Sequence, residues 1–262
     1  MELSVAGKQV QATTGGRPLD PESPLLVFIH GAGMDRTLWQ LQTRYFANHG
    51  WSVLAVDLPG HGGSDGPPPN SIAGYAAWVA ELIPAAGFPS ASIVGHSMGS
   101  FVGLHLAADQ PGIVDRLALL GTAATMPVHP DLLAAAAADD PLAFDLITNW
   151  SLARGSQLGG HKTPGLWMTG ETVRILEHTS PGVLANDLRA CNTYGEATDA
   201  AAKVTCPTLL LLGELDVMTR PPGARPLATA LPDATTVILK GAGHMMMMEQ
   251  PDPVIDTLAG FL

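Results

Sequence analysis

The sequence has little cysteine and little charge. Its two cysteines, Cys191 and Cys206, are too few for a disulfide framework or a cysteine-ligated metal cluster, so we expect reduced thiols. Charged residues make up 14% of the 262 residues, and acidic residues outnumber basic ones by 24 to 13. The basic residues are scattered and form no positive stripe, so we expect neither nucleic acid nor a membrane as a partner.

Long hydrophobic runs are absent as well. No apolar run reaches the roughly 20 residues that a membrane-spanning helix needs. Residues 1–8 have neither the basic start nor the apolar centre of a secretory signal peptide. We therefore expect a cytoplasmic protein.

The patterns that hold metals and nucleotides are also missing. Histidine, cysteine and carboxylate residues show no spacing typical of a metal site. The glycine-rich residues 31–33 lack the G-x-G-x-x-G pattern of a dinucleotide site. The sequence thus predicts a protein without a cofactor.

Short apolar runs recur along the chain at regular intervals. Segments of helical length separate them, and residues 3–14 before them alternate in polarity, which predicts an antiparallel edge hairpin. This alternation of strands and helices predicts an α/β fold with a doubly wound sheet. The predicted strands are 25–29, 52–56, 92–94, 117–120, 208–212 and 236–239, and the predicted helices are 37–49, 71–86, 99–110 and 253–262.

The alternation of strands and helices is interrupted once, at residues 124–203, which contain no strand-like run. A helical insertion between two strands is expected to cover the carboxyl ends of the strands, where such sheets bind ligands. We therefore predict a core of residues 1–123 and 204–262 with a helical lid of residues 124–203. The helical patches within it are 131–139, 141–150, 171–178 and 182–191.

The most informative motif is GHSMG at residues 95–99. It lies between a predicted strand and a predicted helix, which places Ser97 at the apex of a tight turn. Side chains at the two glycines would collide with the strand and the helix, and the helix N-terminus favours negative charge. The motif therefore predicts that Ser97 is a nucleophile.

Two later strand ends carry residues that would activate such a serine. Asp216 follows the strand 208–212, and His244 follows the strand 236–239. The histidine would accept the serine proton, and the aspartate would orient the imidazole. Ser97, Asp216 and His244 form the predicted triad, and weaker candidates for the acid are Glu214, Asp187 and Asp199.

A glycine-rich loop follows the strand 25–29. Such a loop leaves backbone N–H groups free to face a developing negative charge. The N–H groups of Ala32 and Met98 are the predicted oxyanion hole.

Taken together, these motifs resemble the α/β-hydrolase superfamily, over residues 25–262. Residues 57–64 (DLPGHGGS) match its D-x-x-G-x-G-x-S pattern, which is typical of the lidded serine-hydrolase branch, and residues 243–251 match its usual ending. The resemblance implies a mostly parallel eight-stranded sheet and carboxylesterase-like activity. A serine at residue 97 differs from the aspartate of related dehalogenases and epoxide hydrolases, so those chemistries are not expected.

Several residues are candidates for the substrate pocket. Gly33 lies beside the predicted oxyanion hole, Trp150 and Trp167 lie in the lid, and Met245 follows the base. The run of methionines at residues 245–248 fits core packing or an apolar acyl pocket, because methionine does both. His30, His61 and His96 are expected to hold loops rather than to react, and the lid has few basic residues to bind an acid: Arg154, Lys162, Arg174, Arg189 and Lys203.

The sequence thus predicts a serine hydrolase that cleaves a small to medium, largely apolar ester through an acyl-enzyme. The expected partner is a small-molecule acyl substrate, and the oligomeric state is not predicted. The same triad supports lactone opening, thioester or carbon–carbon bond hydrolysis and perhydrolysis, because the lid and pocket choose the substrate. A ligand receptor on the same fold would bind tightly without turnover.

Overall fold

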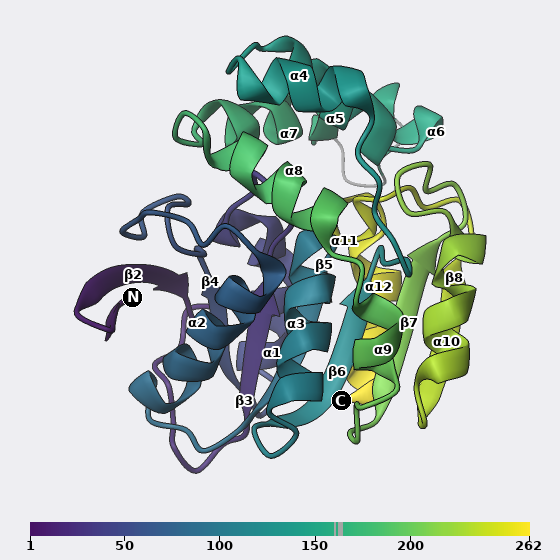
Figure 1. Ribbon diagram of the computed structural model, residues 1–262. Coiled ribbons are helices and arrows are strands. Elements are labelled where there is room, and N and C mark those ends of the chain that lie inside the picture. Colours follow the sequence, from purple (N-terminus) through teal and green to yellow (C-terminus); the bar gives the residue numbers. More distant parts are fainter. Residues whose placement is uncertain (160, 162–164) are drawn as a thin grey trace.

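A computed structural model describes residues 1–159, 161 and 165–262 of the protein. Lys162, counted above among the basic residues of the lid, lies outside these described residues. An eight-stranded sheet runs through the centre of the molecule (Figure 1). Its strand order is β1-β2-β4-β3-β5-β6-β7-β8.

The sheet is mostly parallel. β1 pairs antiparallel with β2 and β2 with β4, whereas the other neighbouring strands are parallel. The predicted edge hairpin and the predicted eight-stranded sheet are therefore confirmed. The strands are β1 Glu2–Val5, β2 Lys8–Thr13, β3 Leu25–Ile29, β4 Ser52–Val56, β5 Ala91–His96, β6 Val114–Leu120, β7 Thr208–Gly213 and β8 Ala234–Leu239.

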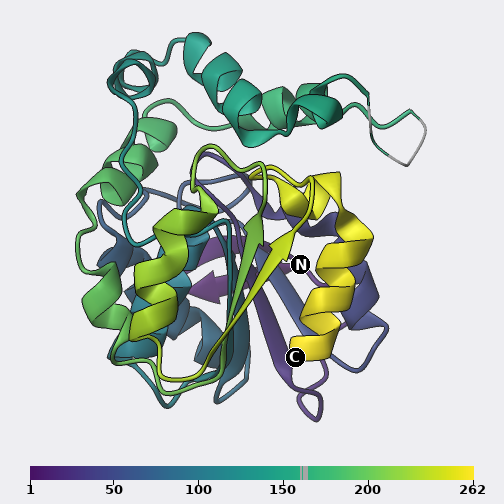
Figure 2. The same ribbon diagram turned by 90° about the vertical axis from the view of Figure 1, so that its right-hand side faces the viewer.

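Helices cover both faces of the sheet. Figure 2 shows α12 on the opposite side of the sheet from α10. The helices outside the segment between β6 and β7 are η1 Arg36–Trp39, α1 Gln40–Ala47, α2 Ile72–Ala85, α3 Met98–Asp109, η2 Pro221–Ala224, α10 Arg225–Ala230, α11 Met246–Glu249 and α12 Pro251–Phe261.

Two hydrophobic clusters hold the helices to the sheet, one cluster on each face. In β3, Val27 packs into a cluster with α2 and α3, and Phe28 packs into a second cluster with α1, α11 and α12. Successive strand residues point to opposite faces, so a strand buried on both faces is a continuous apolar run. This is why the core strands were visible in the sequence.

The predicted helix 37–49 is wrong in its first turn. The Asp35 carboxylate accepts a hydrogen bond from the Thr37 N–H at 2.8 Å, and the chain then forms the tighter 3₁₀ helix η1 before α1 begins. Asp35 thus caps the start of this helical segment, and a 3₁₀ turn at the N-terminal end of an α-helix is common.

A helical segment separates β6 from β7. Figure 1 shows α4, α5, α7 and α8 beyond the carboxyl ends of the parallel strands, whereas α9 packs beside α3 and α10. In the described part of the chain, no helix is long and apolar enough to cross a membrane. The helices of this segment are α4 Pro130–Ala137, α5 Leu142–Ser151, α6 Arg154–Gln157, α7 Met168–Glu177, α8 Val183–Thr193 and α9 Ala197–Ala201.

Candidate active site

Ser97 lies in the turn between β5 and α3, where its backbone has a φ of 53°. A Cβ atom on Gly95 would lie 2.1 Å from the Gly99 oxygen, and one on Gly99 would lie 2.4 Å from the Ile29 oxygen. Both glycines are therefore required by close backbone contacts. A positive φ at a serine is strained and is held here by its surroundings, as at many functional sites.

Asp216 and His244 meet beyond the ends of β7 and β8, where both are buried. Asp216 Oδ2 lies 2.7 Å from His244 Nδ1. Burial raises the pKa of the Asp216 carboxyl, but His244 and the hydrogen bonds from His244 and Thr219 outweigh it and hold that pKa below its ordinary value. Asp216 is thus a carboxylate at neutral pH and accepts a hydrogen bond from Nδ1–H of His244.

The second ring nitrogen of His244 is left open. Among the described residues, Nε2 of His244 has no hydrogen-bond partner, and the ring lines the same pocket as Ser97. A neutral imidazole that donates from Nδ1 carries its lone pair on Nε2. His244 therefore presents a proton acceptor to the pocket.

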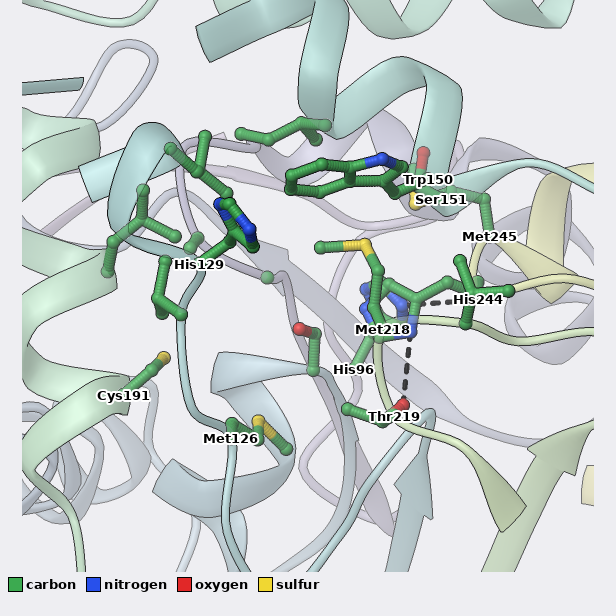
Figure 3. A pocket seen from close by; sticks show the side chains of 18 of the residues that line it. His96, Met126, His129, Trp150, Ser151, Cys191, Met218, Thr219, His244 and Met245 are labelled. Carbon is green, nitrogen blue, oxygen red and sulfur yellow. Dashed lines mark hydrogen bonds between the residues drawn. The ribbon is translucent and has the colours of Figure 1, made fainter. Parts of the chain in front are cut away.

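Thr219 is a contact that sequence reasoning missed. Its hydroxyl donates to Asp216 Oδ2 at 2.7 Å, and its N–H and that of Met218 each donate to Oδ1 at 2.8 Å. These bonds fix the orientation of the carboxylate beside His244. Figure 3 shows Thr219 next to the His244 ring, where its hydroxyl oxygen lies 3.2 Å from Nδ1. An aspartate followed three residues later by threonine at a strand end is the signal of such a turn.

His96 supports the histidine loop. Its Nε2–H donates to the backbone oxygen of His244 at 3.0 Å, and the two ring centroids lie 4.6 Å apart. Burial and the neighbouring His244 hold the pKa of His96 well below its ordinary value. The neutral His96 thus packs and hydrogen-bonds, and it also lines the pocket.

The glycine-rich loop after β3 lies against the elbow. A Cβ atom on Gly31 would lie only 3.2 Å from the Cβ atom of Ser97. Within the described part of the chain, the N–H groups of Ala32 and Met98 donate to no other protein group. Both N–H groups thus lack a protein acceptor among these residues.

The three weaker candidates for the acid lie elsewhere. Glu214 is exposed and accepts a hydrogen bond from the Gly241 N–H, and Asp199 is exposed on α9. Asp187 is buried and pairs with His61 at 2.7 Å. The structure brings Asp216 alone of these four to His244.

A pocket of about 460 Å³ opens in front of Ser97 and His244. Figure 3 shows Trp150 and Met218 on the side of His244, with His129 and Cys191 across the pocket in this view. No acidic side chain is among its described lining residues. The sheet part contributes Gly31, Ala32, Met34, His96, Ser97, Val217, Met218, Thr219, Arg220, His244 and Met245, and the helical segment contributes Met126, Pro127, Val128, His129, Leu132, Ile147, Trp150, Ser151, Leu188 and Cys191.

Two of the four predicted pocket residues lie in this pocket and two do not. Trp150 and Met245 line it, whereas the Trp167 side chain is 71% exposed. Gly33 is not among the described lining residues, and its N–H donates to the buried Asp187. The sequence places Trp167 in the helical segment, but it does not show whether the side chain faces the pocket or solvent.

The methionine run serves mainly as core. Residues 245–248 all belong to the hydrophobic cluster that includes α12, and Met245 also lines the pocket. Among the described residues, no group of three or more histidine, cysteine or carboxylate side chains is placed to hold a metal ion.

Comparison with known proteins places this geometry in a family. The Alpha/beta hydrolase family matches residues 26–257. A pimeloyl-[acyl-carrier protein] methyl ester esterase of Neisseria meningitidis serogroup B (strain H44/76) is 31% identical over 235 residues, which cover 82% of this chain and 84% of that protein.

Solved structures have the same fold. A thermophilic esterase matches with a TM-score of 0.80 and 28% identity, over 100% of this chain and 96% of that one. The enol-lactonase from Burkholderia xenovorans LB400 matches with a TM-score of 0.88 and 24% identity, over 100% of this chain and 99% of that one, which is evidence of the fold alone. The chain thus belongs to the alpha/beta hydrolase family and is a hydrolase.

Proposed function

We propose that the protein is a serine hydrolase that cleaves a small to medium, largely apolar ester. The observation that carries this proposal is the 2.7 Å contact between Asp216 and His244, which leaves Nε2 of His244 facing the pocket that Ser97 lines. An esterase among the matched relatives supports the ester as the substrate class. Ser97, Asp216 and His244 are the proposed catalytic residues.

The proposed reaction follows from the positions of these groups. Nε2 of His244 takes the proton from Ser97 Oγ as the oxygen attacks the ester carbonyl, and Asp216 stabilises the imidazolium that forms. The N–H groups of Ala32 and Met98 bind the oxyanion. His244 then gives the proton to the leaving alcohol, and a water molecule activated by His244 releases the acid from the acyl-enzyme.

The proposed acyl site is the apolar part of the pocket. Trp150, Met245 and Leu188 line it together with other apolar side chains, and burial of such surface favours alkyl groups by roughly 25 cal/mol per Å². We further propose that residues 124–203 act as a lid, because this segment supplies 10 of the 21 described lining residues. Substrate choice then depends mainly on this segment.

Hydrolysis of p-nitrophenyl esters from acetate to decanoate tests the proposal. We expect wild-type turnover that depends on acyl length and is lost in Ser97→Ala. Ser90→Ala is the matched control, because Ser90 is half-buried and bonded to Asp115 at the opposite end of β5. Equal activity in Ser97→Ala and wild type would contradict the proposal.

Assays of lactones and thioesters beside this ester series distinguish the other reactions that the triad supports. Turnover of lactones or thioesters in preference to these esters would keep Ser97 as the nucleophile and change the substrate class. Tight binding of an ester without turnover in wild type would instead indicate a ligand receptor, as would ordering of the lid by ligand alone.

A further inference from the structure

A second buried carboxylate lies next to the site and takes no part in the proposed triad. Asp187 on α8 is fully buried, and its Oδ2 accepts hydrogen bonds from the Gly33 N–H at 2.9 Å and from His61 Nε2 at 2.7 Å. Its Oδ1 accepts from the Tyr75 hydroxyl at 2.6 Å. Asp187 therefore joins the helical segment, the loop after β4, helix α2 and the loop after β3.

His61 is held here as a cation. Its Nε2 faces the Asp187 carboxylate and its Nδ1 faces the Pro59 carbonyl at 3.1 Å, so both nitrogens face acceptors and both carry a proton. Burial lowers the pKa of His61, but Asp187 outweighs burial and raises it above its ordinary value. The charge of Asp187 is thus balanced within the protein.

His30 beside it is neutral and holds the other end of the loop. Its Nε2 accepts a hydrogen bond from the Leu58 N–H, so the ring proton is on Nδ1, which donates to the Gly31 oxygen at 2.8 Å. Burial and the nearby His61 lower the pKa of His30 to about 3. A neutral histidine therefore fixes Gly31, and a charged pair fixes Gly33.

Gly33 is held from both sides by the helical segment. Its N–H donates to Asp187, and its carbonyl accepts from the Thr179 hydroxyl. Its φ is +65°, and a Cβ atom there would lie 2.8 Å from the Leu184 side chain. Ala32, whose N–H belongs to the proposed oxyanion hole, thus lies between two anchored glycines.

We propose that Asp187 is a positioning residue for the oxyanion hole: by anchoring Gly33, it holds the Ala32 N–H in the direction of the reacting carbonyl. This inference rests on the proposed function. It makes the helical segment part of the catalytic machinery, because displacement of α8 would release the loop that carries one of the two oxyanion donors. A hydrogen bond to the oxyanion stabilises the transition state more than it stabilises the bound substrate.

The test is Asp187→Asn, which keeps the volume and removes the charge that His61 and Gly33 share. With p-nitrophenyl butyrate we expect kcat to fall at least about tenfold while KM changes less than about threefold, because a displaced oxyanion donor weakens the transition state alone. Thr172→Val is the matched control: its hydroxyl is buried in the same segment but bonds within α7, to Met168. We expect its kcat to stay within about twofold of wild type.

A second readout separates positioning from general destabilisation. Ser97 Oγ adds to the carbonyl of an alkyl trifluoromethyl ketone, His244 takes the serine proton, and the ketone oxygen becomes an oxyanion in the hole. Asp187→Asn should weaken inhibition by this ketone by the same factor as kcat, while inhibition by the matching methyl ketone stays unchanged. A folded Asp187→Asn with wild-type kcat, or with a lower kcat and unchanged trifluoromethyl ketone affinity, would overturn the proposal.

Tyr75→Phe gives the answer if Asp187→Asn does not fold. It removes one hydrogen bond to Oδ1 and keeps the ion pair, so we expect the same pattern with a smaller loss, about two- to fivefold in kcat. Wild-type kcat in Tyr75→Phe would then overturn the proposal. Ser97→Ala is run in parallel: if it stays active, the proposed function fails, whereas an inactive Ser97→Ala beside an unaffected Asp187→Asn overturns the positioning role alone.

Discussion

Two buried histidine–carboxylate pairs, His244–Asp216 and His61–Asp187, have the same 2.7 Å spacing and differ in what the second ring nitrogen contacts. His61 uses both nitrogens on protein acceptors, so it has no lone pair for a substrate proton. His244 uses only Nδ1 within the described part of the chain and turns Nε2 to the pocket. At the scale of single residues, this difference separates a candidate base from a loop anchor.

Asp216→Asn tests the candidate base. An asparagine amide donates where the carboxylate accepts, so His244 is expected to turn its proton to Nε2 and lose its capacity to deprotonate Ser97. We expect kcat for p-nitrophenyl butyrate to fall by about 10³- to 10⁴-fold with little change in KM. A decrease of less than about tenfold in a folded variant would argue that the pair is structural.

Thr219→Val tests the contact that sequence reasoning missed. The change keeps the side-chain shape and removes the hydroxyl that donates to Asp216 Oδ2. A hydrogen bond to a charged group contributes about 1.5–3 kcal/mol, and we expect a loss in kcat of about fivefold or more. Steady-state kinetics with the ester series would measure it, and an unchanged kcat would show that the Thr219 hydroxyl is dispensable.

At the scale of the element, the β5-to-α3 turn depends on Gly99. Gly99→Ala would place a Cβ atom 2.4 Å from the Ile29 oxygen and 2.7 Å from the His30 oxygen, so backbone must move. We expect the free energy of unfolding to fall by about 1–3 kcal/mol, together with a loss of activity, because β3 and the elbow separate. Urea unfolding measures the first effect.

Gly112→Ala is the control for that substitution. A Cβ atom at Gly112 has no atom within 4 Å. We expect its free energy of unfolding to stay within about 0.5 kcal/mol of wild type. Equal effects of the two changes would show that the elbow glycine is not required by packing.

The elements differ in how far the sequence revealed them. The buried strands were predictable because both faces are apolar, and the order of Ser97, Asp216 and His244 after strand ends was predictable because parallel strands place their carboxyl ends at one edge. The direction of Trp167 was not, because it depends on how the helices of residues 124–203 pack together. The Asp187–His61 pair was also not predictable, because its members lie 126 residues apart and join only in the folded chain.

At the scale of the whole molecule, buried neutral histidines make stability depend on pH. The folded-state pKa of His30 is lowered to about 3, whereas an unfolded histidine has a pKa near about 6.5. Because the folded value is the lower one, the stabilisation is present above about pH 6.5 and is lost as the pH falls toward about 3. His61 has a raised pKa and acts in the opposite sense, because its contribution is present below about pH 6.5 and is lost as the pH rises through its folded-state value.

The variant His30→Asn, compared with wild type, tests this pH dependence. Between about pH 7.5 and about pH 5, wild type should lose free energy of unfolding that the variant, which lacks this titrating ring, does not lose. Urea unfolding at the two pH values measures the difference. Parallel slopes for the two proteins would contradict a neutral His30 in the folded state.

The chain has a net charge of −11, and its acidic residues outnumber its basic ones. The described lining of the pocket nevertheless contains no acidic side chain. Asp216 is outside that lining, and its carboxylate is bonded to His244 and Thr219. A neutral acyl group would therefore meet no carboxylate among the described lining residues.

The most direct test of the central claim is the mass of the protein after reaction with a fluorophosphonate. Ser97 Oγ would displace fluoride from phosphorus, with His244 accepting the serine proton. We predict one phosphonate adduct in wild type and in Ser90→Ala, at Ser97 by peptide mapping, and none in Ser97→Ala, with much slower labelling of His244→Ala. An adduct that forms at the wild-type rate in Ser97→Ala, or no adduct in wild type, would contradict the account of Ser97 as an activated nucleophile.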